Sequence, residues 1–226
     1  PASEQIRSMA REARVPFIIG SDQIIRAPAL QYFNSAFLVR DDGSTGGVYQ
    51  KMHLVPFGEY VPARKVLFFA ESLVASVSDF SPGQTLTLLS VGGRQVSVAI
   101  CYEVVYANEV RRAVVEGSEL LATITNDAWF LRSAASLQHA QASVFRAIEG
   151  RVWVARAANT GWSGFIDPAG RRRPIPEQVP RFEPGFAISR VHASLDSSAY
   201  IRWGDWFPIL CLILVGGAFL PSRRPV

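Results

Sequence analysis

The 226-residue sequence has few of the residues that build metal sites or covalent scaffolds. It contains two cysteines, Cys101 and Cys211, and three histidines, His53, His139 and His192. Two cysteines exclude a disulfide scaffold and a cysteine-based zinc site, and the histidines lack the spacing of metal ligands. We therefore expect neither a metal nor another cofactor.

Lysine is also scarce, since only Lys51 and Lys65 occur among the 23 basic residues and all the others are arginine. With 19 acidic residues, the formal net charge is +4. The arginines are scattered apart from residues 171–173, which lie in an expected turn. This distribution argues against a nucleic-acid partner.

The composition excludes several broad classes of protein. With 49% hydrophobic and 19% charged residues, the chain can bury a sizeable core and is too apolar to be disordered. Its length fits one large domain, or one domain with an appendage. The chain begins without a methionine, a basic region or an apolar signal segment, so we interpret it as part of a longer polypeptide.

The longest uncharged run lies near the end of the chain, from Trp206 to Leu220. Its 15 residues are short for a bilayer core, which takes about 20 apolar residues. It could be a buried core helix, but the tryptophans before it, the arginines 223–224 after it and the internal glycine pair favour the membrane. We interpret 206–220 as a transmembrane helix, with 221–226 as a cytoplasmic tail and the preceding domain outside the cytoplasm.

Strand and helix patterns alternate before this run. The hydrophobic periodicity and the turn residues predict helices over 3–13, 108–116 and 137–149, strands over 17–19, 95–100, 120–125 and 151–157, and hairpins over 32–51 and 164–170. Alternation of this kind predicts an α/β or layered α+β architecture.

Chemistry-bearing residues follow the predicted strands. Cys101 ends an apolar strand, and such strand ends hold nucleophiles rigidly in α/β folds, although an inert core cysteine fits the position as well. Lys51 ends another strand and enters a loop that carries Glu59; a surface lysine beside an ordinary turn is the alternative. Asn126, Asp127 and Trp129 follow a third strand.

Together these segments resemble the carbon–nitrogen hydrolase (nitrilase) superfamily and, within it, the apolipoprotein N-acyltransferases of the bacterial envelope. The motifs that carry the resemblance, in the family's order, are YQKMHLVPFGEYVP, AICYEVVY, ITNDAWF, QHAQASVFRAIEGR and RAANTGWSGFIDPAG. The resemblance implies a nitrilase-like α-β-β-α sandwich over residues 1–200, lacking its N-terminal strand-helix-strand, followed by the transmembrane helix.

The resemblance also implies roles for individual residues. Cys101 would be the nucleophile, and Lys51 would stabilise the oxyanion together with the backbone N–H of Tyr102. Glu59 matches an acidic residue expected to orient Lys51, and Glu103 matches a residue that the acyltransferase branch needs. Asn126 and Trp129 are expected to contact the substrate.

The third member of the family's Glu-Lys-Cys triad, the general-base glutamate, has no match in this chain. In the family it precedes the first helix, and Glu4 lies inside that helix. Leu131, Ala135 and Ser136 also stand where the family has glycine, glycine and proline, and Val144 stands in place of an arginine. The first three departures change the loop near the predicted acyl-donor site, and Val144 implies the loss of a polar contact.

The implied partners are a phospholipid acyl donor, the N-terminal cysteine of a lipoprotein as acceptor, and the membrane. The implied location is the bacterial inner membrane, with the catalytic domain on the periplasmic side and the C-terminus in the cytoplasm. Residues 66–69 and 73–74 could form a lipid-facing arm or a helix of the core.

Two other functions remain open on the sequence. A soluble amidase or nitrilase would use the same triad and give the acyl group to water. A catalytically dead member acting as a binding module would fit the missing base and the altered loop.

Overall fold

The computed structural model describes residues 2–26, 28–62, 79–173, 179–193 and 196–218. These residues form two β-sheets. An antiparallel three-stranded sheet has the order β1 (Phe17–Ile25), β2 (Gln31–Val39) and β3 (Thr45–Gln50). A five-stranded sheet has the order β4 (Leu89–Val91), β5 (Arg94–Ile100), β6 (Leu120–Thr125), β7 (Trp153–Ala158) and β8 (Gly164–Ile166), in which β5, β6 and β7 are parallel and the outer pairs are antiparallel.

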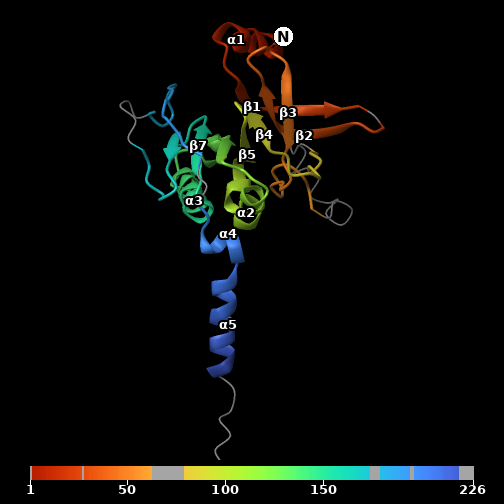
Figure 1. Ribbon diagram of the computed structural model, residues 1–226. Coiled ribbons are helices and arrows are strands. Elements are labelled where there is room, and N and C mark those ends of the chain that lie inside the picture. The colour runs from red at the N-terminus through yellow and green to blue at the C-terminus, as the bar shows by residue number, and fades with distance from the viewer. Residues whose placement is uncertain (1, 27, 63–78, 174–178, 194–195, 219–226) are drawn as a thin grey trace, which may run out of the picture.

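The sheets and helices pack in layers (Figure 1). One apolar cluster lies between the two sheets, where Ala36 and Leu38 of β2 meet Val98 and Ile100 of β5. Ala99 points to the opposite face of β5, where α2 (Ala107–Val115) and α3 (Ala135–Gly150) cover the sheet with a second apolar cluster. Side chains alternate between the faces of a strand, so β5 contributes to both clusters and is buried on both sides.

The predicted elements before residue 200 are largely confirmed. Helix α1 (Ala2–Ala13), the β2–β3 hairpin, β5, β6, α2, α3 and β7 all lie within a few residues of the expected ranges. The predicted layered α/β architecture is confirmed. Helix α1 lies at the β2–β3 turn, where Arg7 donates to the carbonyl of Gly43 over 2.6 Å. The predicted lipid-facing arm (66–69 and 73–74) and the predicted tail (221–226) lie outside the described residues.

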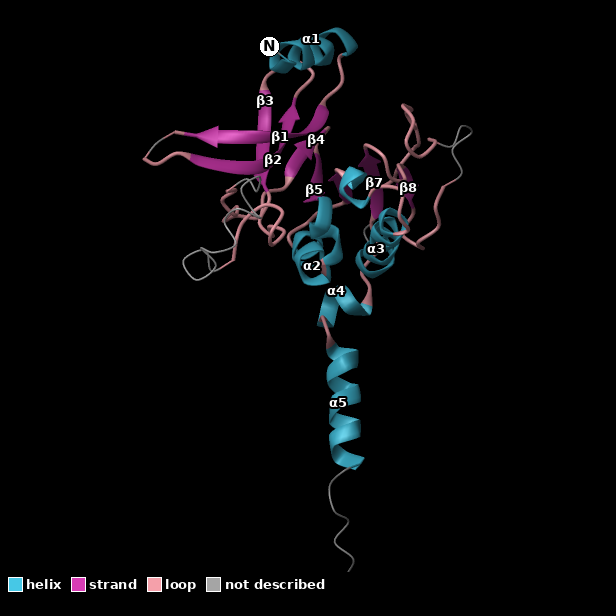
Figure 2. Ribbon diagram, turned by 180° about the vertical axis from the view of Figure 1, so that it is seen from behind, coloured by secondary structure: helices cyan, strands magenta, loops and turns pink. Residues whose placement is uncertain are grey.

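The two C-terminal helices differ in how they contact the domain. Helix α4 (Ala199–Trp203) packs against α2 and α3, and Arg111 Nε donates to the carbonyl of Tyr200 over 2.9 Å. Helix α5 (Trp206–Ala218) then extends away from the layers, as Figures 1 and 2 both show. Its apolar side chains are exposed, so the alternative of a buried core helix is wrong.

The transmembrane prediction for 206–220 is met only in part. The run is helical from Trp206 to Ala218, which is 13 residues. Across the described ranges, no helix combines the length and the apolar character that crossing a bilayer requires. At a rise of 1.5 Å per residue, the described helix extends about 20 Å, which is less than the hydrocarbon core of about 30 Å.

Candidate active site

Cys101 occupies a strained turn at the end of β5. It is the first residue of the short helix η2 (Cys101–Val105), and its φ of 52° lies in the left-handed region that favours glycine. A non-glycine residue in this region costs about 1–3 kcal/mol and persists only where its surroundings hold it. A sharp strand-to-helix turn of this kind projects a nucleophile from the edge of a sheet.

Lys51 follows directly after β3 and is almost completely buried, with 1% of its surface exposed. Its Nζ lies 2.6 Å from Oε2 of Glu59. That oxygen also accepts the N–H of Val55 over 2.8 Å, while Oε1 accepts from Nδ2 of Asn34 over 2.8 Å. Glu59 therefore fixes both the charge of Lys51 and the loop that follows it, which is the pairing expected from the sequence.

Glu103 connects the lysine loop to the cysteine turn. Its Oε1 accepts from the hydroxyl of Tyr49 over 2.9 Å and from the N–H groups of Met52 and His53 over 2.7 and 3.1 Å. Its Oε2 accepts the N–H of Ile100 over 2.8 Å. Four donors from two strand ends thus converge on one carboxylate, which fixes the end of β3 relative to the end of β5.

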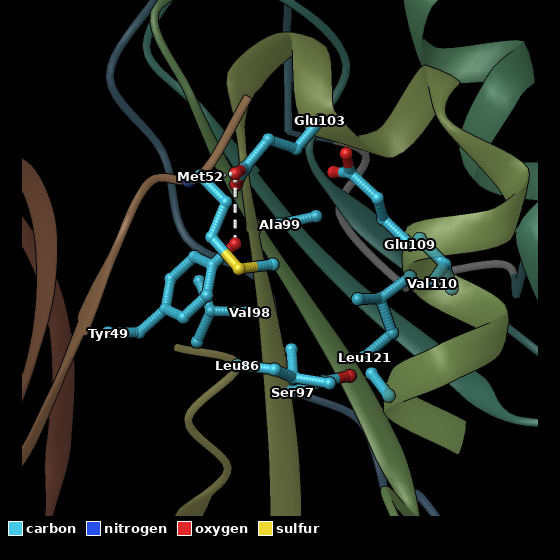
Figure 3. A pocket seen from close by; sticks show the side chains of 11 residues that line it. Tyr49, Met52, Leu86, Ser97, Val98, Ala99, Glu103, Glu109, Val110 and Leu121 are labelled. Carbon is cyan, nitrogen blue, oxygen red and sulfur yellow. Dashed lines mark hydrogen bonds between the residues drawn. The ribbon is translucent and has the colours of Figure 1, made fainter. Parts of the chain in front are cut away.

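Burial controls the ionisation of this carboxylate. Glu103 is buried, and its desolvation raises the pKa of the carboxyl above the ordinary value, against the opposing effect of the N–H groups of Ile100 and His53. The remaining space beside Glu103 is a cavity of about 10 Å³, lined by Tyr49, Met52 and other side chains (Figure 3). This volume suits at most one water molecule, so this cavity is too small to hold a substrate.

A buried cluster of three polar residues contacts the Cys101 turn. Asp127 follows β6, His139 lies in α3 and Arg156 lies in β7. His139 Nδ1 is 3.0 Å from Asp127 Oδ1, and His139 Nε2 is 3.1 Å from the carbonyl oxygen of Cys101. Arg156 Nη2 donates to Asp127 Oδ2 over 2.8 Å. The cluster therefore connects the cysteine turn to α3 and to the next two parallel strands.

The charges within this cluster stabilise one another. Burial alone would raise the pKa of Asp127, but the contacts with His139 and Arg156 outweigh it and lower that pKa. Burial lowers the pKa of Arg156, and the carboxylate of Asp127 opposes that shift. A Cβ atom at Gly161 would clash with Oδ2 of Asp127, so only glycine fits beside the carboxylate.

The sequence motifs assigned no catalytic or binding role to these three residues. A usable signal was nevertheless present, because the carboxyl ends of parallel strands meet at one edge of a sheet. Asp127 follows β6 just as Cys101 follows β5, and Arg156 lies near the end of β7. His139 could not be placed in this way, since its contact with Cys101 depends on how α3 packs on the sheet.

The other predicted site residues lie around this edge. Asn126 closes a loop, because its Oδ1 accepts from Nδ2 of Asn159 over 2.6 Å and from the N–H of Ala128 over 3.3 Å. Tyr102 is exposed beside the cysteine turn, and its ring stacks near that of His139. Trp129 projects into solvent from η3 (Asp127–Phe130), with 75% of its surface exposed. The predicted substrate contacts of Asn126, Tyr102 and Trp129 stay predictions.

Metal coordination finds no support in the arrangement. Within the part of the chain that the structure describes, no group of three or more histidine, cysteine, aspartate or glutamate side chains could hold a metal ion. The chemistry available at the described site is that of a thiol, a buried lysine and backbone N–H groups.

Comparisons with known proteins place the chain in a family. The carbon–nitrogen hydrolase family matches residues 1–198. An apolipoprotein N-acyltransferase of Geobacter metallireducens is 41% identical over 93% of this chain and 40% of its own length. Its counterpart in Methylococcus capsulatus is 36% identical over 97% of this chain and 42% of its own length. The chain thus spans about two fifths of the length of these curated relatives.

Solved structures support the same fold. An amidase from Nesterenkonia sp. AN1, with acrylamide added at its active-site cysteine, superposes with a TM-score of 0.61 over 94% of this chain and 74% of its own, at 23% identity. The NitFhit protein of C. elegans superposes with a TM-score of 0.59 over 75% of this chain and 41% of its own, at 21% identity. At these identities the likeness concerns the fold alone.

Proposed function

Because the chain belongs to the carbon–nitrogen hydrolase family, we propose that it is the catalytic domain of a membrane N-acyltransferase. The proposed reaction moves a fatty acyl chain from a phospholipid, through a thioester on Cys101, to the N-terminal amine of a lipoprotein. The identity of about 40% to apolipoprotein N-acyltransferases supports this substrate class. The observation that carries the proposal is helix α5, which gives the domain a surface suited to lipid.

Helix α5 is apolar all round. Residues 212–215 have 73%, 63%, 65% and 56% of their surfaces exposed, and consecutive residues of a helix point about 100° apart. A helix that is apolar on every side and exposed along its described length is unfavourable in water but suits the interior of a bilayer. A soluble amidase has no use for such a helix, so α5 favours the acyltransferase over the hydrolase.

The geometry suggests how the first step proceeds. The thiolate of Cys101 attacks the ester carbonyl of the phospholipid, and the resulting oxyanion is stabilised by Lys51 and the N–H of Tyr102. Collapse of the tetrahedral intermediate breaks the ester C–O bond, leaves the acyl group on sulfur, and releases a lysophospholipid whose oxygen takes up a proton.

The second step regenerates the thiol. The free amine of the acceptor attacks the thioester carbonyl, the C–S bond breaks, and the proton lost by the nitrogen returns to the cysteine sulfur. Glu59 and Glu103 act indirectly in both steps, since Glu59 orients Lys51 and Glu103 fixes the lysine loop against the cysteine turn.

The glutamates that the sequence analysis weighed as a base are engaged elsewhere in the described structure, so we propose that the general base is a carboxylate outside the described residues. Glu59 is engaged with Lys51 and Val55, Glu103 accepts four hydrogen bonds, and Glu4 pairs with Arg11 on an exposed helix surface. An apolar groove of about 660 Å³ runs over β6–β8 and reaches Thr125 and Arg156 at the site edge. A further segment lying in this groove would bring its own carboxylate to the strand ends.

We place the domain at the bacterial inner membrane, on the periplasmic side. Trp203 and Trp206 stand at the domain end of α5, where aromatic residues anchor a helix to the lipid interface. Arginines 223–224 follow the helix in the sequence, and the positive-inside tendency assigns them to the cytoplasm.

The test is acyl-enzyme formation by the full-length protein in detergent with phospholipid, followed by mass spectrometry of the peptide that contains Cys101. We expect an acyl adduct that an amine acceptor removes as an amide. Cys101→Ala should abolish the adduct, and Lys51→Ala should slow its formation by about 10²–10³-fold, the usual loss of one oxyanion donor.

Cys211→Ser is the matched control, since Cys211 lies exposed in α5 and should not matter for acylation. Turnover by Cys101→Ala would exclude covalent catalysis through this residue. Transfer of the acyl group to water in the presence of amine would favour the hydrolase, and an inert wild-type protein would favour the binding module.

A further inference from the structure

We propose that His139 is a positioning residue for the nucleophile, holding the strained turn of Cys101 through the carbonyl oxygen of that residue. His139 lies in α3, far from Cys101 in sequence, yet its Nε2 is 3.1 Å from Cys101 O. This contact restrains the peptide group that follows the cysteine, and with it the N–H of Tyr102. The inference rests on the proposed role of Cys101 as nucleophile.

The chemistry of the partners fixes the direction of this hydrogen bond. A backbone carbonyl can only accept, so Nε2 of His139 must carry a proton. On the other side of the ring, Nδ1 faces the carboxylate oxygen Oδ1 of Asp127 over 3.0 Å. The contact with Cys101 therefore depends on the ring staying in place.

Asp127 and Arg156 hold the ring from the other side. Asp127 Oδ1 lies 3.0 Å from Nδ1 of His139, and Arg156 Nη2 lies 3.2 Å from the same nitrogen. Arg156 also donates to Asp127 and, through Nε, to the carbonyl of Trp162 over 3.1 Å. The ring is thus fixed by β6 and β7, and a displacement of either strand end would reach the nucleophile.

The left-handed φ of Cys101 explains why such a restraint is needed. Without it, the residue would relax toward an ordinary backbone conformation, because 52° is unfavourable for any residue with a Cβ atom. Relaxation would turn the thiol and the following N–H away from their present positions relative to Lys51. A misplacement of about 1 Å in an active site lowers the rate by up to about 100-fold.

The experiment compares two amide variants in the full-length protein, His139→Gln and His139→Asn. The amide nitrogen of glutamine can take the place of Nε2 and reach Cys101 O, whereas that of asparagine takes the place of Nδ1 and reaches only Asp127. Iodoacetamide is the probe: the thiolate forms an S–C bond as the C–I bond breaks and iodide leaves. Mass spectrometry measures alkylation of Cys101, with the wild-type protein treated in parallel as the reference.

We expect His139→Asn to lower the rate of alkylation of Cys101 by about 10-fold or more relative to the wild type, and to lower kcat for acylation by about 10–100-fold with KM nearly unchanged. His139→Gln should stay within about three-fold of the wild type, because the bond to Cys101 is retained. Val144→Ala is the control, since it also removes buried packing from α3 but touches the apolar cluster instead of the cysteine turn.

The inference would be overturned if His139→Gln and His139→Asn lowered alkylation of Cys101 equally. It would also be overturned if Val144→Ala lowered that alkylation as much as His139→Asn does. Failure of the proposed function gives a different result. A wild-type protein that forms no acyl adduct, but whose alkylation depends on His139 as described, would overturn the acyltransferase and support the positioning role.

Discussion

Cys101 and Leu131, two of the non-glycine residues with a positive φ near the site, have different surroundings. Cys101 has a φ of 52° and is restrained by hydrogen bonds around its turn. Leu131 has a φ of 49° and a ψ of −143°, and it follows η3 with 75% of its surface exposed. At Cys101 the strained turn holds the thiol proposed as the nucleophile, whereas the exposed side chain of Leu131 has no role here that would offset the strain. The sequence resemblance places a glycine at the second position, and the backbone shows why.

Leu131→Gly is therefore expected to stabilise the protein. Removing the Cβ atom relieves about 1–3 kcal/mol of backbone strain, and the greater freedom of glycine in the unfolded chain offsets about 0.5–1 kcal/mol of that gain. The net increase in the free energy of unfolding should be about 1 kcal/mol, measured by urea denaturation. Leu131→Ala is the control, since it keeps the Cβ atom; equal stability of the alanine and glycine variants would contradict the strain.

Single residues were predictable from the sequence where a motif marked them. The scarcity of lysine and the position of Lys51 at a strand end drew attention to it, and its burial against Glu59 accords with that interpretation. His139 carried no comparable signal, because a histidine within a helix is ordinary until the helix is placed on the sheet. Its hydrogen bond to Cys101 is a property of the packing of α3.

At the scale of elements, Glu103 is the main connection between the two sheets at the site. Three of its donors come from the end of β3 and the loop after it, and the fourth, Ile100, ends β5. The cysteine and lysine elements belong to different sheets, so their relative position depends on this carboxylate as well as on the apolar cluster between the sheets.

Glu103→Gln should separate the contribution of this carboxylate from that of the apolar cluster between the sheets. The amide oxygen can still serve one set of donors, but its NH₂ group faces another N–H, which leaves buried donors unpaired at a cost of about 1–3 kcal/mol. The free energy of unfolding should fall by about that amount at acidic pH, measured by urea denaturation. Tyr49→Phe is the control, because it removes one hydroxyl donor and leaves the carboxylate intact.

The same variant tests the ionisation of Glu103. Its pKa is raised in the folded protein, so the folded state binds the proton more tightly than the unfolded state. The stability contributed by the protonated carboxyl is complete below the ordinary pKa of 4.5 and is lost as the pH rises toward the folded pKa. Glutamine does not titrate, so the gap between wild type and Glu103→Gln should narrow as the pH rises; a widening gap would contradict the raised pKa.

The regular elements were predictable because their apolar residues follow simple periods. Strand β6 was predicted with its observed bounds, and α2 and α3 were predicted to within two residues at each end. The short elements β4, η2 and η3 were missed. Each has five residues or fewer, so its own sequence carries little periodicity and contacts with neighbouring elements determine its form.

At the scale of the whole molecule, the layered body and α5 differ in whether their apolar residues are buried. The body buries its apolar residues between sheets and helices, whereas α5 extends beyond α4 with its apolar residues exposed (Figures 1 and 2). The sequence predicted an apolar helix at this place but could not determine whether it packs on the domain. That depends on α4, which docks on α2 and α3 and directs the next helix outward.

If α5 enters lipid, removing it should abolish membrane binding by the 226-residue chain. Burying a leucine- or isoleucine-sized side chain stabilises the bound state by about 1.5–3 kcal/mol, and α5 exposes several of them. We therefore expect residues 1–226 to float with phospholipid vesicles in a density gradient, and residues 1–204 to stay at the bottom. Leu212→Lys, in the middle of the helix, should weaken flotation because a charge must then enter the apolar layer.

Ile24→Lys is the matched control for this substitution. Ile24 is also an exposed apolar residue near the end of β1, and β1 lies away from α5 (Figure 2). The same charge placed there should leave flotation unchanged. If residues 1–204 floated as well as 1–226, or if both lysine variants bound equally, the lipid contact would belong to the layered body, and α5 would lose its role as the feature that separates this domain from a soluble hydrolase.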